Sequence, residues 1–406
     1  MSTFFDFANA QLASHNDTLR QQLWERFVEV GLPSTTDEVW RYAPLGDFDL
    51  DSFVATDSSG QAAPLADALA AHAGVTAHVV DGVLTHVDGE ADGLRIQQTA
   101  AETSIVLEHY DGDAFALLNG ALTPNPITIE VGAGATVSGP LLIVNTTTRS
   151  TSFPQLIIHA GDNSTLSIVE YVAGGANALV VPLTELHVGV NASLHLTTYQ
   201  RLAPTAWHIA RSGAYLAKDA RLRQSVISLG GHYNRSRNDA DMVGANAENE
   251  LRTTFLGTGT QIHDYRTRQF HIAGRTRSTL LSKGAVADTA RSVYTGLIEI
   301  EKGAKRTDAR QTNHNLLLSP HAHADSVPNL DIRENDVMCA HASSVGPLDE
   351  LQRWYLESRG VPRDVAERLM IQGFFYEMVA TLPEGLAAVV EADITEALAA
   401  TTVVTP

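Results

Sequence analysis

The sequence predicts a mainly β protein built around a solenoid, a coil of stacked strand turns, with a helical region at each end. A corner of small residues recurs through the middle of the chain, and its successive starts lie 29, 28, 28 and 27 residues apart. The five corners begin at Gly132, Gly161, Gly189, Ala217 and Gly244. Between them the chain alternates as strands do, whereas helix-type spacing of apolar residues appears before and after this repeat.

Residues 1–110 are expected to be helical at the start and mixed afterwards. Over Thr18–Val30, apolar residues recur at spacings of three and four, and Gly31 and Pro33 end the pattern. A second short helix is expected after Ser34, whose hydroxyl can accept a hydrogen bond from its first turn. From about residue 47 the chain is acidic and weakly patterned, so no single element is predicted there.

Residues 111–342 are expected to form the solenoid core. Gly, Asn and Asp at the corners tolerate left-handed backbone angles, which a coil needs wherever it bends sharply. A fainter corner starts at Ala287 after a gap of 43 residues, and another small-residue stretch starts at Gly303. The competing interpretation is a two-sheet sandwich with hairpins, but hairpin loops vary in length and would not keep the corner spacing nearly constant.

Residues 343–406 are expected to form a helical region. Leu348, Leu351, Tyr355 and Leu356 make one apolar stripe, which ends at Gly360. Pro362 opens a second helix that carries Phe374 and Phe375, and a third helix is predicted over residues 384–400.

The composition excludes several classes of protein. Lys plus Arg total 28 against 47 Asp plus Glu, and this charge of −19 disfavours nucleic-acid binding. One cysteine, Cys339, excludes a disulfide framework or a cluster held by this chain's own thiolates. The sequence contains no ATP-binding P-loop. No signal peptide and no run of 18 apolar residues is visible, so we expect a soluble, cytoplasmic protein without membrane contact.

The candidate chemistry lies at the end of the predicted core. If Asp336–Gly346 is a strand, Cys339 and His341 share one face, where a thiolate and an imidazole suit iron or zinc. They supply half a site at most, and a buried cysteine beside a hydrogen-bonded histidine is the plainer alternative. Other histidines cluster nearby, namely His314, His321 and His323; the His-x-His at 321–323 could chelate, but beside Pro320 it is typical of a solvated loop. The same region is rich in His and Arg, which could bind an anion or simply form a solvated face or subunit interface: His263, His271, Arg266, Arg268, Arg275 and Arg277.

Several motifs along the chain resemble the SufB/SufD family of iron–sulfur cluster assembly proteins. The resemblance spans nearly the whole chain and is weakest over residues 47–110. It is carried by Gly31-Leu-Pro, Glu38-Val-Trp-Arg-Tyr, Phe115-Ala-Leu-Leu-Asn-Gly-Ala-Leu, Ser282-Lys-Gly-Ala, Gln311-Thr-Asn-His-Asn-Leu-Leu-Leu-Ser, Pro328-Asn-Leu-Asp-Ile, Asp336-Val-Met-Cys-Ala-His-Ala-Ser-Ser-Val-Gly and Tyr355-Leu-Glu-Ser-Arg-Gly.

The chain departs from the SufB type within this family. SufB-type members have a cysteine just before an Asp-Ser-Leu-Leu stretch, where this chain has Asn313-His-Asn-Leu-Leu, and a Glu-His-Glu-Ala run, where it has Cys339-Ala-His-Ala. The Cys-x-His pattern of the SufD type is matched by Cys339 and His341, although the usual following glycine is Ala342 here. The resemblance is therefore to the SufD type.

The resemblance implies a right-handed parallel β-helix and a non-catalytic scaffold subunit of the SUF assembly complex. It implies pairing with a SufB-type subunit through the β-helix and docking of the SufC ATPase by the C-terminal helices, with Leu356, Phe374 and Phe375 as candidate contacts. His341, with Cys339 secondary, would contribute a ligand for iron or nascent cluster shared with SufB. No cofactor is expected to be held stably by the chain alone, and the cluster would be transient. The resemblance also allows a homodimer of the isolated chain. The alternative function is a β-helix enzyme acting on polysaccharide.

Overall fold

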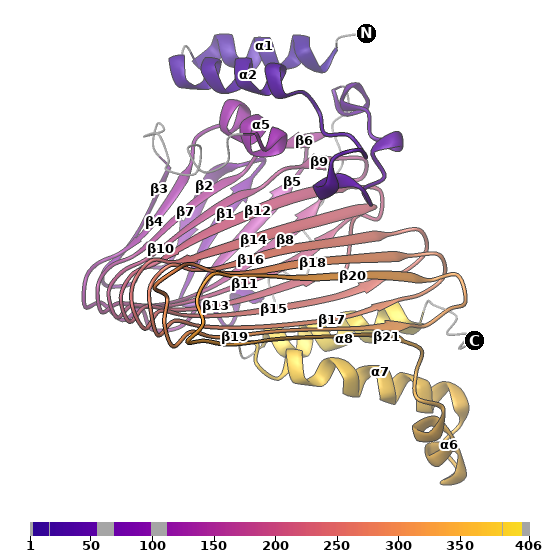
Figure 1. Cartoon of the computed structure of the whole chain (residues 1–406). Helices are drawn as coiled ribbons and strands as arrows, with labels where there is room; N and C mark the ends of the chain where they lie inside the picture. Colours follow the sequence, from indigo (N-terminus) through magenta and orange to yellow (C-terminus); the bar gives the residue numbers. More distant parts are fainter. Residues whose placement is uncertain (1–2, 16, 55–68, 99–111, 384, 400–406) are drawn as a thin grey trace.

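The computed structural model describes residues 3–15, 17–54, 69–98, 112–383 and 385–399. Its centre is a parallel β-solenoid of about 8 turns, with helices at both ends of the chain packed on it (Figure 1). The predicted fold class is confirmed. The two-sheet sandwich with hairpins is excluded, because the central strands pair in parallel.

The strands form two long sheets that enclose the interior of the coil. The first sheet has the order β2 (Val83–Asp88), β1 (Val75–Val80), β5 (Leu141–Thr147), β8 (Thr165–Gly174), β11 (Ser193–Leu202), β13 (Arg221–Ser228), β15 (Glu248–Gly257), β17 (Arg277–Val286), β19 (Asp308–Leu317) and β21 (Met338–Gly346). The second sheet has the order β20 (His323–Ile332), β18 (Arg291–Ile300), β16 (Ile262–His271), β14 (Tyr233–Met242), β12 (Trp207–Leu216), β10 (Leu183–Val188), β7 (Gln155–Ala160), β4 (Ile127–Val131) and β3 (Leu94–Gln98). Short strands β6 (Thr151–Ser152) and β9 (Leu179–Val180) pair beside β12.

The predicted corners lie along one edge of the coil and repeat a left-handed backbone residue. Asn163, Asn191, Asp219 and Asn246 each have φ between 54° and 61°. Their side chains connect neighbouring corners, as where Asn191 Nδ2 donates to Asn163 Oδ1 at 3.0 Å. This ladder explains why the repeat favours Asn and Asp at the third corner position.

The structure differs from the predicted repeat in the placement of its later corners and in the extent of the sheets. The next corner of this edge lies between β16 and β17, where Arg275 takes the left-handed conformation with φ 61°. The corner at Ala287 connects β17 to β18 and therefore lies on the opposite edge. The sheets also extend beyond residues 111–342, since β1, β2 and β3 join them at one end and β21 runs to Gly346 at the other.

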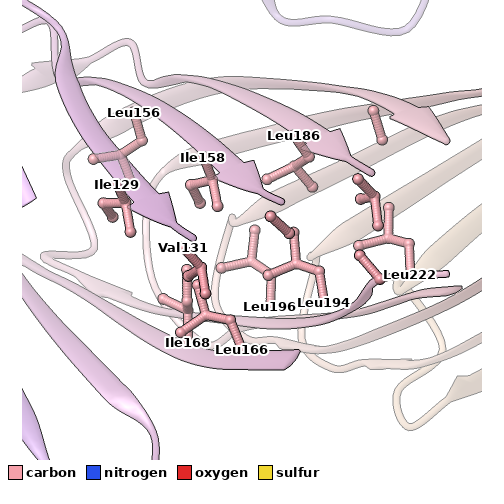
Figure 2. Packing of buried hydrophobic residues seen from close by; sticks show 14 of the residues in the cluster. Ile129, Val131, Leu156, Ile158, Leu166, Ile168, Leu186, Leu194, Leu196 and Leu222 are labelled. Atoms are coloured by element: carbon pink, nitrogen blue, oxygen red, sulfur yellow. The ribbon is translucent and has the colours of Figure 1, made fainter. Parts of the chain in front are cut away.

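The interior of the coil changes character along its length. The early turns are filled with aliphatic side chains, which Figure 2 shows interdigitating between the two sheets. The later turns place buried polar residues at the same inward positions, among them Asn249, His263, Gln269, Gln311 and Asn313. Hydrophobic burial therefore stabilises the first half of the coil more strongly than the second.

The two ends of the coil differ. At the N-terminal end, β2 and β3 pair antiparallel to their neighbours, and Leu84, Val87, Leu94 and Ile96 pack over the apolar interior. At the C-terminal end, β20 and β21 each pair on one side only within the described chain. Inward positions of this last turn remain accessible, with the side chain of Ile332 41% exposed.

Helices cover the two outer faces. Helices α1 (Phe4–His15), α2 (Thr18–Val30) and α5 (Ala114–Leu122) pack together with the short 3-10 turns η1 (Glu38–Trp40), η2 (Leu45–Asp47) and η3 (Leu50–Phe53). At the other end of the chain follow α6 (Glu350–Ser358), α7 (Arg363–Val379) and α8 (Leu386–Ala399). Helices α7 and α8 pack on the outer face of the first sheet, whereas α6 stands away from it (Figure 1). Among the described helices, none is long and apolar enough to span a membrane.

Candidate functional site

The last strand of the coil, β21, carries both residues of the predicted half-site. The contacts of this strand show which side chains point inward: Cys339 packs against inward residues of the previous turn, and Ser343 Oγ lies 2.7 Å from Ser326 Oγ across the interior. Since side chains alternate along a strand, His341 between them points the same way. The two candidate residues therefore share the inward face at the open end of the coil.

Cys339 lies in an environment that disfavours the thiolate. Its side chain is half-buried against Ile298 and Ile300. Burial raises the pKa of the Cys339 thiol, and the nearby Asp308 carboxylate raises the pKa further. A thiol with a raised pKa is a poor nucleophile and must lose its proton before it can ligate a metal.

His341 has a different environment. It is exposed, and within the described chain its ring makes no hydrogen bond or ion pair. In the ladder between β19 and β21, it lies opposite Gln311. An accessible imidazole without an internal partner can ligate a metal ion brought by another molecule.

The acidic residues near the half-site face elsewhere. Glu334 accepts from the backbone N–H groups of Gly303 and Asn335, which lowers the pKa of its carboxyl. Asp331 forms an ion pair with Arg333 at 2.7 Å. These contacts leave Glu334 and Asp331 poorly suited to orient the His341 ring.

No complete metal site exists within the described residues. They contain no group of three or more His, Cys, Asp or Glu side chains that could hold a metal ion together. Cys339 and His341 would therefore need ligands from another chain or from solvent, as the sequence indicates.

The other histidines separate into three environments. His263 and His271 are fully buried inside the coil, and burial lowers their pKa values to about 3 and about 4. His323 lies 3.3 Å from the Asp325 carboxylate at the start of β20. His314 is on the outer face, where its Nδ1 lies 2.5 Å from Ser344 Oγ.

Arg266 and Arg268 of the same region are engaged with carboxylates. Arg266 lies 3.4 Å from Asp264, and Arg268 bridges Asp241 and Glu299. These ion pairs hold the two guanidinium groups against carboxylates, so they compete with the suggested binding of an external anion.

The C-terminal helices present a different apolar surface from the one predicted. Phe375 is 1% exposed within the core that joins α7 and α8 to the first sheet, so it cannot contact a partner in this arrangement. Phe374 is half-buried beside it, with its ring 5.1 Å from Lys283 Nζ, and Leu356 is also half-buried. The exposed apolar residues of this region are Leu351, Trp354, Tyr355, Leu369 and Tyr376.

A groove runs between α7 and α8. Its volume is about 780 Å³, and Leu369, Tyr376 and Ile394 contribute to its walls. Helical spacing predicts the apolar stripe of each helix, but the choice of which stripe faces the coil depends on tertiary packing.

The polar side chains beside the half-site belong to none of the motifs visible in the sequence. Asn313 donates to Ser326 at 2.8 Å, and Ser326 in turn contacts Ser343 of β21. The sequence pattern that could have revealed them is an amide at every second position, 311, 313 and 315. This alternation places three polar side chains on the inward face of one strand.

The fold and the half-site define a class of protein: a parallel β-solenoid with an exposed inward histidine on its open last turn. Residues 142–374, more than half of the chain, match the family described as "SUF system FeS cluster assembly, SufBD core domain". The chain belongs to this family.

Individual relatives agree with the family assignment. The chain is 28% identical over 387 residues to the iron–sulfur cluster assembly protein SufD of Escherichia coli, covering 90% of this chain and 89% of that one. It is 29% identical over 302 residues to SufD of Bacillus subtilis, covering 71% and 69%. A SufBD family protein of Mycobacterium tuberculosis is 28% identical over 394 residues, covering 92% of each. The chain is thus a SufD-type member of the family. This assignment places the protein in iron–sulfur cluster assembly and leaves no support for the alternative of a polysaccharide-active enzyme.

Proposed function

We propose that this chain is a non-catalytic scaffold subunit of a SUF complex, in which it pairs with a SufB-type subunit and binds a SufC-type ATPase. Its open last turn supplies a ligand for iron or nascent cluster, and the cluster is substrate rather than resident cofactor. The observation that carries the proposal is the exposed, unpartnered His341 on the last strand of a coil whose end is uncovered within the described chain.

The open end has the chemistry of an interface with another solenoid. Strands β20 and β21 offer N–H and C=O groups on their outer edges, and such edges are templates for pairing with another chain. Met338, Ile332 and Val345 add apolar surface there, with exposed fractions of 62%, 41% and 42%. A SufB-type coil seated on this end would bury the apolar residues and bring its own ligands close to His341.

The ATPase is proposed to bind at the C-terminal helices. Leu351 and Trp354 of α6 are 77% and 66% exposed, which is unusual for large apolar side chains and typical of partner surfaces. The chain itself lacks a P-loop, so ATP hydrolysis would belong to the partner.

The roles of the two half-site residues differ in this proposal. His341 ligates iron through a ring nitrogen of its exposed imidazole. Cys339, whose thiol pKa is raised, has a lesser role. The remaining ligands come from the SufB-type subunit.

The test is the maturation of an iron–sulfur reporter enzyme in cells that express the chain with its SufB- and SufC-type partners. His341→Ala should leave the three subunits co-purifying and abolish maturation, and Cys339→Ser should reduce it only mildly. The matched control is His323→Ala, which removes a surface imidazole from β20. Full maturation with His341→Ala would refute the proposed role of the histidine.

A second measurement addresses the scaffold itself. The purified chain alone should neither hydrolyse ATP nor retain a cluster, because one cysteine cannot replace the four ligands that clusters usually take. A stoichiometric, oxygen-sensitive cluster on the single chain would contradict this part of the proposal.

A further inference from the structure

A buried amide without a hydrogen-bond partner lies one turn below His341. Gln311 is 1% exposed on β19, and neither Nε2 nor Oε1 of its carboxamide has a partner among the described residues. A buried polar group left in this state lowers stability, so natural proteins satisfy nearly all such groups. Several buried side chains of the described coil have one unpartnered polar atom, but Gln311 alone among the described residues has two.

The position of Gln311 suggests what the amide is for. Its register partner in the ladder is His341, so the two side chains follow one another on the inward face of adjacent strands. Parallel neighbours lie about 4.8 Å apart, so a change of rotamer can bring the carboxamide and the imidazole together, although the two side chains make no hydrogen bond in this arrangement.

The space around the amide is built to hold it. On the facing sheet, a Cβ at Gly296 would lie 2.5 Å from Gln311 Nε2 and 2.5 Å from Tyr294 Oη, so only glycine leaves room for both groups. The neighbouring inward amides each keep one hydrogen bond, since Asn313 donates to Ser326 and Asn315 Oδ1 lies 3.4 Å from Ser292 Oγ. Gln311 is thus held in place, and both of its polar atoms are left without a partner among the described residues.

A metal-binding histidine needs a partner of this kind. The ring nitrogen that does not bind the metal usually donates to an oxygen, which fixes the tautomer and the orientation of the ring. The nearby carboxylates Glu334 and Asp331 are engaged elsewhere.

We propose that Gln311 is a positioning residue for His341: its carboxamide oxygen accepts the N–H of one ring nitrogen and directs the other toward iron at the open end. This inference rests on the proposed function of His341 and adds the residue that orients it. The amide is retained at a cost in stability because the site requires it.

This role predicts that removal of the amide changes thermal stability and cluster maturation in opposite directions. Gln311→Leu removes the unpartnered amide and keeps an apolar side chain of similar size, so the thermal midpoint of the isolated chain should rise by about 2 °C. Maturation of the reporter enzyme in cells should fall about tenfold, with co-purification of the partners unchanged. A purely structural glutamine would move stability and maturation in the same direction, and that result would overturn the proposal.

Two further variants locate the effect. Gln224→Leu replaces a buried glutamine of β13, far from the open end, and should leave maturation unchanged. Gln311→Leu combined with His341→Ala should mature no worse than His341→Ala alone, because the amide acts through the imidazole.

The outcomes separate this inference from the proposed function. If His341→Ala matures clusters normally, the proposed function fails and Gln311 has no imidazole to position. If His341→Ala is inactive while Gln311→Leu is fully active, the function stands and the positioning role alone is refuted.

Discussion

Phe375 offers a direct test of how the C-terminal helices are held. The ring is 1% exposed in the cluster that joins α7 and α8 to β5, β8 and β11. Truncation of a buried phenylalanine to alanine costs about 3–5 kcal/mol through lost burial and the cavity left behind. Whole domains are stable by only about 5–15 kcal/mol, so Phe375→Ala should remove most of the free energy that docks these helices.

The loss should be local. The solenoid strands pair with one another over long registers, such as the ten residue pairs between β15 and β17, and these do not involve α7. Hydrogen–deuterium exchange should therefore accelerate in α7 and α8 and remain slow in the central strands.

A matched variant separates packing from partner binding. Leu351→Ala truncates a side chain that is 77% exposed, so it should leave exchange unchanged and weaken binding of the SufC-type ATPase. Unchanged exchange of α7 in Phe375→Ala, or equal acceleration in helices and central strands, would refute the packing argument.

Three further predictions concern charge and pH. Lys283→Met removes the 2.6 Å ion pair between Lys283 and Glu377 of α7. Because the Glu377 carboxylate is 59% exposed, hydrogen exchange in α7 should increase by no more than the equivalent of about 1 kcal/mol. The hydrogen bond from Lys283 lowers the pKa of Glu377, so this ion pair is fully present at neutral pH and should be lost as pH falls below the ordinary glutamate range. Lys283→Met should abolish this acid dependence of exchange in α7. Burial lowers the pKa of His208 to about 4. Protonation of this residue should therefore cost the chain about 3 kcal/mol of stability as pH falls from about 6.5 to about 4. The unfolding midpoint of His208→Gln should decline less steeply over the same pH range. Val345→Asp places a carboxylate on the open end and should weaken co-purification with the SufB-type subunit without lowering the thermal midpoint of the chain alone; undiminished co-purification would exclude this surface from the interface.

The sequence predicts the solenoid because its corners demand particular residues. A left-handed backbone angle that few other residue types accept occurs at Asn163, Asn191 and Asn246. The period of the repeat is therefore visible in the sequence as a recurring asparagine. The corner at Arg275 escapes detection because a long cationic residue takes that same angle, which intrinsic preference does not indicate. Strands β2 and β3 escape because they cover the apolar end of the coil and do not carry the repeat.

The half-site is predictable only in part. Alternation places Cys339 and His341 on one face, but the exposure of that face depends on where the coil ends. The helical stripe that includes Phe375 shows that α7 is amphipathic, yet only the packed structure shows that this ring faces the coil. The importance of Gln311 appears only when its neighbours in space are known, since a lone glutamine in a strand carries no pattern.

The difference between the two ends of the coil limits how the chain can polymerise. A solenoid accessible at both ends could stack head to tail into a filament of indefinite length. Here Leu84 and Leu94 cover one end, so growth can proceed from the other end alone. Two such coils that meet by their open ends leave no further end for a third, and assembly stops at a pair. In the proposed pair with a SufB-type subunit, His341 of this chain and the last-turn residues of the partner would lie together at the junction of the two coils.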